Sequence, residues 1–183
     1  MNTPCPLDKG HKRENFDCGK EALNRYLKSQ ARQSQDKNAA RTFVICRNEQ
    51  TGSSADVAVI GYCTLVFGSI DRLESVSLPE HLIRGLGKSH PVPILLLARW
   101  AVDERYQGQG VGATLLDFVI DITYKASLMG GLKGLVVDAK DEETYDKYIA
   151  NGFTGLSRTQ LRAFLPIDYI VKLKQPACMT SSV

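Results

Sequence analysis

The stretch Arg105-Tyr106-Gln107-Gly108-Gln109-Gly110-Val111-Gly112 decides the fold of this chain of 183 residues. An apolar run, Ile94–Val102, precedes it and predicts a buried strand. A strand, a glycine-rich turn and a helix start suit phosphate groups, because glycines let the backbone approach an oxyanion and the first N–H groups of the helix point at it. The stretch therefore predicts a site for a phosphorylated ligand. The helix is predicted from apolar residues that recur every three or four positions: Val111, Leu115, Phe118, Val119, Ile122 and Ala126.

Three kinds of phosphate-binding loop can be compared with this stretch. A Walker A loop needs a lysine directly after its last glycine, and none follows Gly112, so nucleotide hydrolysis of that type is disfavoured. A dinucleotide-binding pattern, G-x-G-x-x-A, matches Gly108, Gly110 and Ala113, although that pattern normally follows its strand directly and opens its domain. Gln107, Gly110 and Gly112 fill a third pattern, Gln/Arg-x-x-Gly-x-Gly/Ala. This pattern resembles the pyrophosphate loop of the GNAT superfamily of N-acetyltransferases, which bind acetyl-coenzyme A. A glycine-rich connection without a ligand is the alternative.

A tyrosine further along the chain strengthens this resemblance. An apolar strand, Gly134–Ala139, precedes a helical stretch, Glu142–Asn151, and the pattern Tyr148-x-x-x-Gly152-Phe ends it. The pattern resembles the GNAT segment whose tyrosine can protonate the departing coenzyme A thiolate. The reaction needs such a donor, because the thiolate leaves as the conjugate base of a thiol with a pKa of roughly 8.5. The resemblance implies that Tyr148 is the general acid; a core aromatic role, or the nearby Tyr145, is the alternative.

Two further segments narrow the resemblance to one branch. Asn15-Phe16-Asp17-Cys18-Gly19 precedes an amphipathic helix, and Pro91-Val92-Pro93 leads into the strand before the loop. Together they resemble the acetyltransferase toxins of bacterial toxin–antitoxin pairs, over residues 16–174. The resemblance implies acetylation of the α-amine of an aminoacyl-tRNA, arrest of translation and a cognate antitoxin, and family members often form homodimers. Lys147, where the family often has an aromatic residue, and the tail beyond Lys174 depart from the pattern.

The resemblance also assigns contacts to the coenzyme and the acceptor. In GNAT proteins the fourth and fifth strands splay apart and the pantetheine arm pairs with the fourth, which assigns it to Ala101 and Val102. Arg99 interrupts an apolar run, so it either pairs with a carboxylate or, as we expect, reaches the acceptor. Asp138 is a weaker candidate for orienting the acceptor, and no general base is visible; an α-amine with a pKa near 8 needs only a water chain. The amides assigned to the pyrophosphate are those of Gln107, Gly108, Gln109, Gly110, Val111, Gly112 and Ala113.

Composition indicates one domain over residues 1–183, with tails near 1–8 and 176–183 that we expect to fray. Five cysteines, an odd number without Cys-x-x-Cys spacing, and three scattered histidines predict neither a disulfide framework nor a metal site. No apolar run approaches the roughly 20 residues that span a bilayer, and no signal-peptide pattern opens the chain. We therefore expect a cytoplasmic protein with no metal and no membrane partner.

Positive charge is concentrated in the N-terminal part of the chain. The net charge of the chain is only +3, but residues 1–47 hold ten Lys and Arg against five Asp and Glu, a local net charge of +5. Arg25, Lys28 and Arg32 recur at helical spacing and predict a basic stripe that a tRNA could meet through its phosphates. Arg158 and Arg162 are candidates to extend it. A solvated helix face is the alternative.

The pattern as a whole predicts an α/β domain, and the resemblance implies the GNAT fold: a mixed, mostly antiparallel twisted sheet flanked by helices. Two other functions remain open: a GNAT enzyme for a protein or small-molecule amine, and a non-catalytic acetyl-coenzyme A-binding regulator. Besides the segments above, we expect a helix at 19–35, strands at 42–47 and 57–68, and a closing strand pair at 153–156 and 161–172.

Overall fold

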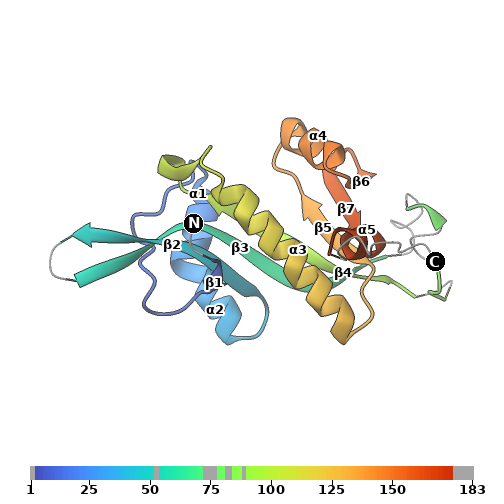
Figure 1. The fold of residues 1–183 in the computed structure, drawn as a ribbon, viewed down its shortest axis with the longest axis horizontal. Helices are drawn as coiled ribbons and strands as arrows, with labels where there is room; N and C mark the ends of the chain where they lie inside the picture. Colours follow the sequence, from blue (N-terminus) through green and yellow to red (C-terminus); the bar gives the residue numbers. More distant parts are fainter. Residues whose placement is uncertain (1–2, 52–53, 72–77, 81–83, 88–89, 175–183) are drawn as a thin grey trace, which may run out of the picture. The chain divides into compact units, whose positions relative to one another are not determined.

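The computed structural model describes residues 3–51, 54–71, 78–80, 84–87 and 90–174 (Figure 1). The backbone divides into two compact units. The first unit consists of Met1–Phe67 and Leu97–Val119, and the second of Gly68–Leu96 and Ile120–Val183.

A long antiparallel hairpin dominates the first unit. It is formed by β2 (Arg41–Thr51) and β3 (Ser54–Ile70), with a register shift at Ile45 and Cys46 (Figure 1). The short strand β1 (Cys5–Pro6) adds to β2, with Cys5 opposite Val44. Leu7 follows it and is only 2% exposed. The expectation that residues 1–8 fray is therefore wrong for Cys5–Leu7, because strand pairing and burial hold them.

The predicted helix at 19–35 is interrupted by a π-helical segment. It consists of α1 (Glu21–Arg25), the π-helix η1 (Tyr26–Gln30) and α2 (Ala31–Asp36). The N–H of Ala31 donates to the carbonyl of Tyr26, five residues earlier, and the Ser29 hydroxyl donates to the carbonyl of Arg25 at 2.7 Å. Such side-chain bonding to the preceding turn competes with the regular helix ladder, and π-turns often occur at functional sites.

The buried face of this helix forms the core of the first unit with the hairpin. Tyr26 and Tyr62 stack at 6.3 Å between ring centroids, and Phe16 meets Tyr62 edge-on at 5.6 Å. Leu27 and Ala31 are fully buried in the same cluster. Burial of these apolar side chains fixes the helix against the sheet.

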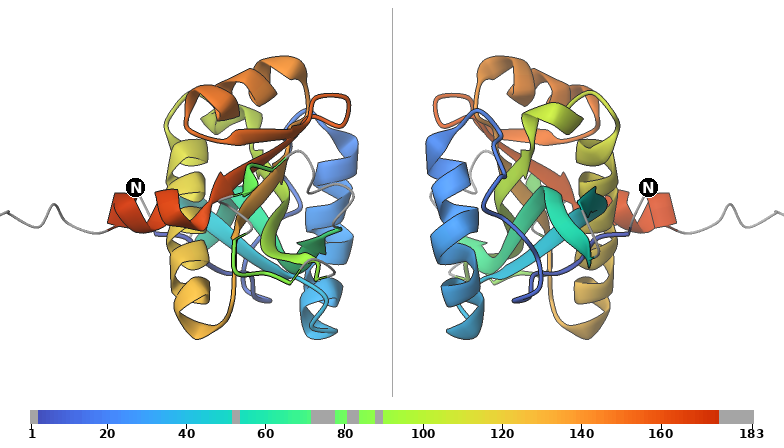
Figure 2. Two further views of the ribbon diagram at one scale, coloured as in Figure 1. Left: turned by 90° about the vertical axis from the view of Figure 1, so that its right-hand side faces the viewer. Right: turned by 90° about the vertical axis from the view of Figure 1, so that its left-hand side faces the viewer.

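Among the described residues, three strands and two helices lie wholly within the second unit. The strand β7 (Arg162–Pro166) pairs on one side with β5 (Gly134–Asp138) and on the other with β6 (Thr154–Ser157). The helix α4 (Glu142–Ala150) lies beside β7, and the helix α5 (Ile167–Lys174) follows β7 directly in the chain (Figure 2). The predicted strand at 161–172 is therefore wrong beyond Pro166. Proline lacks the N–H that a strand ladder needs and is suited to the start of a helix.

Three elements of the described residues contribute to both units. They are the strand β3, the strand β4 (Val92–Val102) and the 19-residue helix α3 (Val111–Met129). The strands follow the order β1-β2-β3-β4-β5-β7-β6, in which β4 and β5 are parallel neighbours and the sheet is mixed. Neither α3 nor any other helix of the described residues is long and apolar enough to cross a membrane.

Gly61 on β3 permits close packing of α3. A Cβ atom at Gly61 would lie 2.8 Å from Cγ1 of Val111 and 3.2 Å from Cδ1 of Leu115. We predict that Gly61→Ala lowers the free energy of unfolding by about 1–3 kcal/mol, since extra volume in a packed core forces side chains off their rotamers. Gly68→Ala on the same strand is the control, because the one contact of its Cβ within the described part of the chain is with Ile94, at an ordinary 3.5 Å. Urea denaturation measures both, and equal stability of the two variants would contradict the prediction.

Candidate functional site

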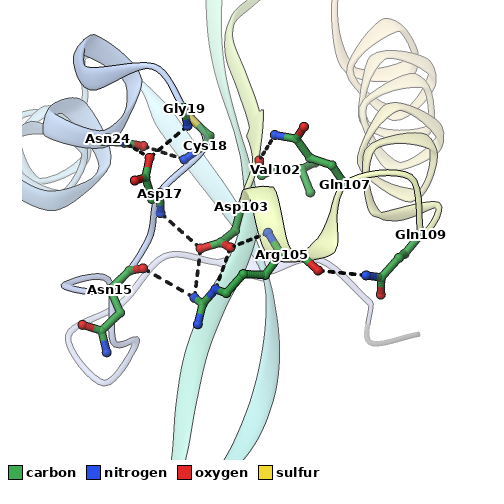
Figure 3. A network of polar contacts seen from close by, with 10 residues as sticks. All are labelled: Asn15, Asp17, Cys18, Gly19, Asn24, Val102, Asp103, Arg105, Gln107 and Gln109. Atoms are coloured by element: carbon green, nitrogen blue, oxygen red, sulfur yellow. Dashed lines mark hydrogen bonds and ion pairs between the residues drawn. The ribbon is translucent and has the colours of Figure 1, made fainter.

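A sharp corner joins β4 to the predicted phosphate loop. Asp103 follows the strand and caps the short 3-10 helix η4 (Glu104–Tyr106), since its carboxylate accepts from the N–H of Arg105 at 3.1 Å. The Arg105 guanidinium donates from Nε to Oδ1 at 2.9 Å and from a terminal nitrogen to Oδ2 at 3.0 Å (Figure 3). The Asp103 side chain is 1% exposed. The corner is thus built around a buried carboxylate held by a two-pronged arginine contact.

The glycines of the loop have separate structural roles. Gly108 and Gly110 adopt left-handed backbone conformations, with φ of 71° and 82°. A Cβ at Gly108 would meet no atom of the described residues within 4 Å, so the surface that they form there is open. Gly112 instead allows close packing, because its Cβ would lie 3.2 Å from the Trp100 ring. The loop therefore turns at two glycines and brings α3 against β4 at a third.

The start of α3 presents backbone N–H groups beside this open surface. The N–H of Thr114 donates to the carbonyl of Gly110 at 3.0 Å, which closes the first turn. The earlier N–H groups, of Val111, Gly112 and Ala113, lie at the helix start, where no intrahelical acceptor exists. Helix starts of this kind bind anionic oxygens, and the dipole of a helix of this length favours negative charge there.

Two glutamine side chains brace the loop from within. The Gln107 amide donates to the carbonyl of Val102 at 3.0 Å, and the Gln109 amide donates to the carbonyl of Arg105 at 2.8 Å (Figure 3). Both contacts tie an exposed loop residue to backbone that precedes it by four or five residues. Two of the loop residues assigned to the pyrophosphate are therefore tied to the backbone of the corner.

The two residues predicted to contact the pantetheine arm, Ala101 and Val102, direct their backbone groups to opposite sides of β4. The N–H of Asp103 donates to the carbonyl of Ile60 on β3 at 3.0 Å. Because backbone groups alternate sides along a strand, Ala101 also directs its groups toward β3, and Val102 directs its own to the opposite edge. Ala101 is 8% exposed and belongs to the core of the first unit. Of the pair, Val102 directs its backbone groups away from β3, and its carbonyl accepts from the Gln107 amide at 3.0 Å.

Arg99 on β4 lies over an aromatic ring. Its Cζ atom is 3.8 Å from the centroid of the Tyr26 ring, the geometry of a cation–π contact. Among the ion pairs of the described residues, none involves Arg99. The Tyr26 hydroxyl is buried and has no hydrogen-bond partner among the described residues. Of the two expectations for Arg99, pairing with a carboxylate is therefore not seen in this part of the chain.

The predicted basic stripe is only partly available to a ligand. Arg25 and Lys28 are exposed, whereas Arg32 is half-buried and lies 3.7 Å from the carboxylate of Asp36. The π-helical segment between them also changes the residue spacing on which the stripe was predicted. Arg25 and Lys28 remain as exposed cations on this helix, and Arg32 is partly neutralised.

Tyr148 and Tyr145 both lie buried on α4 in the second unit. Tyr148 is 6% exposed and packs against Phe153, with ring centroids 5.0 Å apart. Burial raises the pKa of the Tyr148 phenol above its usual value, so the hydroxyl keeps its proton at neutral pH. Tyr145 packs beside Gly155 on β6 and under the guanidinium of Arg158 at 5.6 Å.

The remaining candidate side chains are engaged in ion pairs. Asp138 accepts two hydrogen bonds from Arg162, at 2.7 and 3.2 Å, on the directly opposite position of β7. Arg158 contacts the carboxylates of Glu142 at 3.2 Å and Asp146 at 3.5 Å. Their charges are satisfied within the second unit. Neither arginine therefore adds a free cation to the basic residues of the helix near the N-terminus.

Comparison with known proteins places this geometry in a family. The sequence pattern of the Acetyltransferase (GNAT) family matches residues 11–139, which include β4, the loop and α3. The chain belongs to the GNAT acetyltransferase family. A tRNA-acetylating toxin of Mycobacterium tuberculosis (strain ATCC 25618 / H37Rv) is 31% identical over 134 residues, 73% of each chain.

Solved structures of toxins share the fold. The toxin AtaT complexed with acetyl-methionyl-tRNAfMet is 29% identical, with a TM-score of 0.82 over 94% of this chain and 99% of that one. A tyrosine-to-phenylalanine mutant of AtaT, bound to the C-terminus of the antitoxin AtaR and acetyl-coenzyme A, is 29% identical, with a TM-score of 0.75 over 94% and 98%. The predicted GNAT fold is thereby confirmed.

Several residues of the site were not predicted from the sequence. Asp103 and Arg105 form the corner, Asp17 of the N-terminal segment bonds Asp103, and Asn24 on α1 bonds Asp17. A local signal existed for two of them: an acid directly after an apolar strand with an arginine two residues later favours a capped turn. No local pattern indicates that Asp17, 86 positions away, completes it.

The Asp103 carboxyl links stability of the corner to pH. Burial alone would raise the pKa of Asp103, but hydrogen bonds from Arg105 and from the Asp17 N–H outweigh it and hold the pKa below its usual 3.8. A lowered pKa stabilises the folded state above the unfolded-state value, and this contribution is lost as pH falls through the folded-state value. We predict that Asp103→Asn lowers the free energy of unfolding by about 2 kcal/mol at pH 7.

The deficit of Asp103→Asn should persist down to about pH 5 and shrink at lower pH, because the carboxyl then protonates in the unfolded wild-type protein before it does so in the folded one. Urea denaturation of both proteins at pH 7 and pH 3 measures this. A deficit that grows on acidification would contradict the assigned sign.

Proposed function

We propose that this GNAT-family enzyme transfers the acetyl group of acetyl-coenzyme A to the α-amine of an aminoacyl-tRNA and thereby blocks translation. The observation that carries the proposal is the left-handed turn at Gly108 and Gly110 before α3, in a chain 31% identical to a tRNA-acetylating toxin. Acetylation removes the nucleophilicity of the amine that forms the peptide bond.

The loop supplies the coenzyme side of the reaction. Its residues fit a pyrophosphate, because the helix start presents N–H groups and the surface at Gly108 is open. In the proposal the amides from Gln107 to Ala113 hold the pyrophosphate, and the Val102 backbone holds the pantetheine arm. Ala101 contributes by packing, since its backbone groups face β3.

The acceptor side is assigned to cations of the first unit. Arg99, held over the Tyr26 ring, contacts the aminoacyl end of the tRNA in this proposal, and Arg25 and Lys28 contact its phosphates. Arg32 contributes less to phosphate binding in this proposal, because it already contacts the carboxylate of Asp36. Phosphate contacts of this kind weaken as salt concentration rises.

Tyr148 is the proposed general acid. The amine attacks the thioester carbonyl, the tetrahedral intermediate collapses, and the C–S bond breaks with its electron pair on sulfur. A protonated phenol can donate to this thiolate, and burial keeps Tyr148 protonated across the physiological range. An α-amine with a pKa near 8 is partly neutral at pH 7, so solvent water suffices as the base.

Partners and location follow from this activity. We propose a cytoplasmic enzyme, since its substrates are aminoacyl-tRNA and acetyl-coenzyme A, with a cognate antitoxin as a protein partner. The AtaT toxin, similar over 94% of this chain, is known bound to the C-terminus of its antitoxin. A homodimer remains part of the proposal by family resemblance.

Incubation with radiolabelled acetyl-coenzyme A and total aminoacylated bacterial tRNA tests the proposal. We predict label on the aminoacylated pool and none on deacylated tRNA, because only the former carries a free α-amine on its ester-linked amino acid. The label should be released together with the amino acid by mild alkali, which cleaves that ester. Label on both pools, or on neither while acetyl-coenzyme A still binds, would contradict the proposal and favour a protein or small-molecule amine.

The role of Tyr148 is tested by removal of its hydroxyl alone. We predict that Tyr148→Phe keeps the affinity for acetyl-coenzyme A and lowers kcat by about 10²-fold or more, the usual range for a general acid. Tyr145→Phe is the matched control, since it removes a second buried hydroxyl from the same helix. Single-turnover rates at saturating coenzyme measure both variants. Equal loss in the two variants, or no loss in Tyr148→Phe, would overturn the assignment.

A further inference from the structure

The segment Asn15–Gly19 has no role in the chemistry described so far, yet it meets the corner before the phosphate loop. The N–H of Asp17 donates to Oδ2 of Asp103 at 3.1 Å, and the carbonyl of Asp17 accepts from the N–H of Glu104 at 2.8 Å. Arg105 also reaches the carbonyl of Asn15 at 3.4 Å (Figure 3). The segment is thus bonded to the corner by its backbone, through groups that any residue could supply.

The side chain of Asp17 makes contacts in the opposite direction. Its Oδ1 accepts from the N–H of Gly19 at 2.9 Å and from the amide of Asn24 on α1 at 2.7 Å. Asn24 is 6% exposed, and its own Oδ1 accepts from the N–H of Cys18 at 2.9 Å. A buried asparagine therefore fixes the segment to the start of the helix that carries Arg25, Tyr26 and Lys28.

Gly19 permits the turn of this segment through its backbone conformation. Its φ is 75°, in the left-handed region that favours glycine, and the mobile end of the exposed Glu104 side chain lies beside it. The residue types in the segment thus match the structure: an aspartate that accepts on its side chain, and a glycine where the backbone is left-handed.

We propose that Asp103 is a positioning residue that couples the phosphate loop to the acceptor-side helix through the Asp103–Asp17–Asn24 chain of hydrogen bonds. The Asp103 carboxylate shapes the entry to the loop through Arg105 and at the same time holds the segment that fixes α1. This inference rests on the proposed acetyl transfer, but the coupling itself is measured as a change in the Kd of acetyl-coenzyme A. A change at Asn24, which is not part of the loop, therefore alters the affinity of the loop for acetyl-coenzyme A.

A double-mutant cycle on coenzyme affinity tests the coupling. Calorimetry gives the Kd of acetyl-coenzyme A for the wild type, Asp103→Asn, Asn24→Ala and the double variant. We expect Kd to rise about tenfold in Asp103→Asn and about threefold in Asn24→Ala. The double variant should be no weaker than Asp103→Asn, because residues in one network give non-additive effects.

A stability-matched control separates positioning from general weakening. Thr64→Val removes a buried hydrogen bond in the same unit, between the hydroxyls of Thr42 and Thr64 at 3.0 Å. It leaves the hydrogen bonds from Asp103 through Asp17 to Asn24 unchanged. Its Kd should equal that of the wild type. In the transfer assay, Asp103→Asn and Asn24→Ala should raise KM for both substrates while kcat at saturation stays within about threefold.

Three outcomes would overturn the coupling: an unchanged Kd in Asn24→Ala, a thirtyfold additive loss in the double variant, or the same loss in Thr64→Val. Failure of the proposed function is distinguishable from these. In that case the wild type binds acetyl-coenzyme A without labelling aminoacylated tRNA, and the cycle on Kd still decides the coupling.

Discussion

The buried carboxylate of Asp103 is the constraint on which the arrangement of the first unit depends. A buried charge is costly unless charged and polar donors surround it, and here the donors come from Arg105, two residues later, and Asp17, 86 residues earlier. The charge is fully satisfied only when the N-terminal segment reaches the corner. The hydrogen bonds that satisfy the buried Asp103 carboxylate therefore also fix the entry to the phosphate loop and the start of α1.

Elements with a strong local pattern could be predicted from the sequence. The strand predicted at Ile94–Val102 corresponds to β4, and the helical stretch Glu142–Asn151 to α4, which ends at Ala150. The loop followed from its glycines, because few residues other than glycine adopt the conformations seen at Gly108 and Gly110. In each case the signal lies within about ten residues, where periodicity and backbone sterics determine the structure.

Features that depend on distant contacts could not be predicted in this way. The strand at Cys5–Pro6 exists because β2 offers it an edge, and two residues carry no periodicity of their own. The π-helical turn occurs within an otherwise regular helical pattern, where the Ser29 hydroxyl bonds the carbonyl of Arg25. The site shows the same division: its loop was visible in the sequence, whereas the network from Asp103 through Asp17 to Asn24 required the fold.

The ion pairs of the cationic side chains indicate which kind of molecule accepts the acetyl group. Arg158 and Arg162 contact carboxylates, and a phosphate would have to compete with those partners before it gained anything. Arg25 and Lys28 are exposed, and Arg99 lies over the Tyr26 ring and pairs with no carboxylate among the described residues. A small polycationic acceptor would be repelled by such a set, whereas a polyanion is attracted to it and releases counterions on binding. The cations left over after the fold has satisfied its own ion pairs therefore favour a nucleic acid over a polyamine as the carrier of the amine.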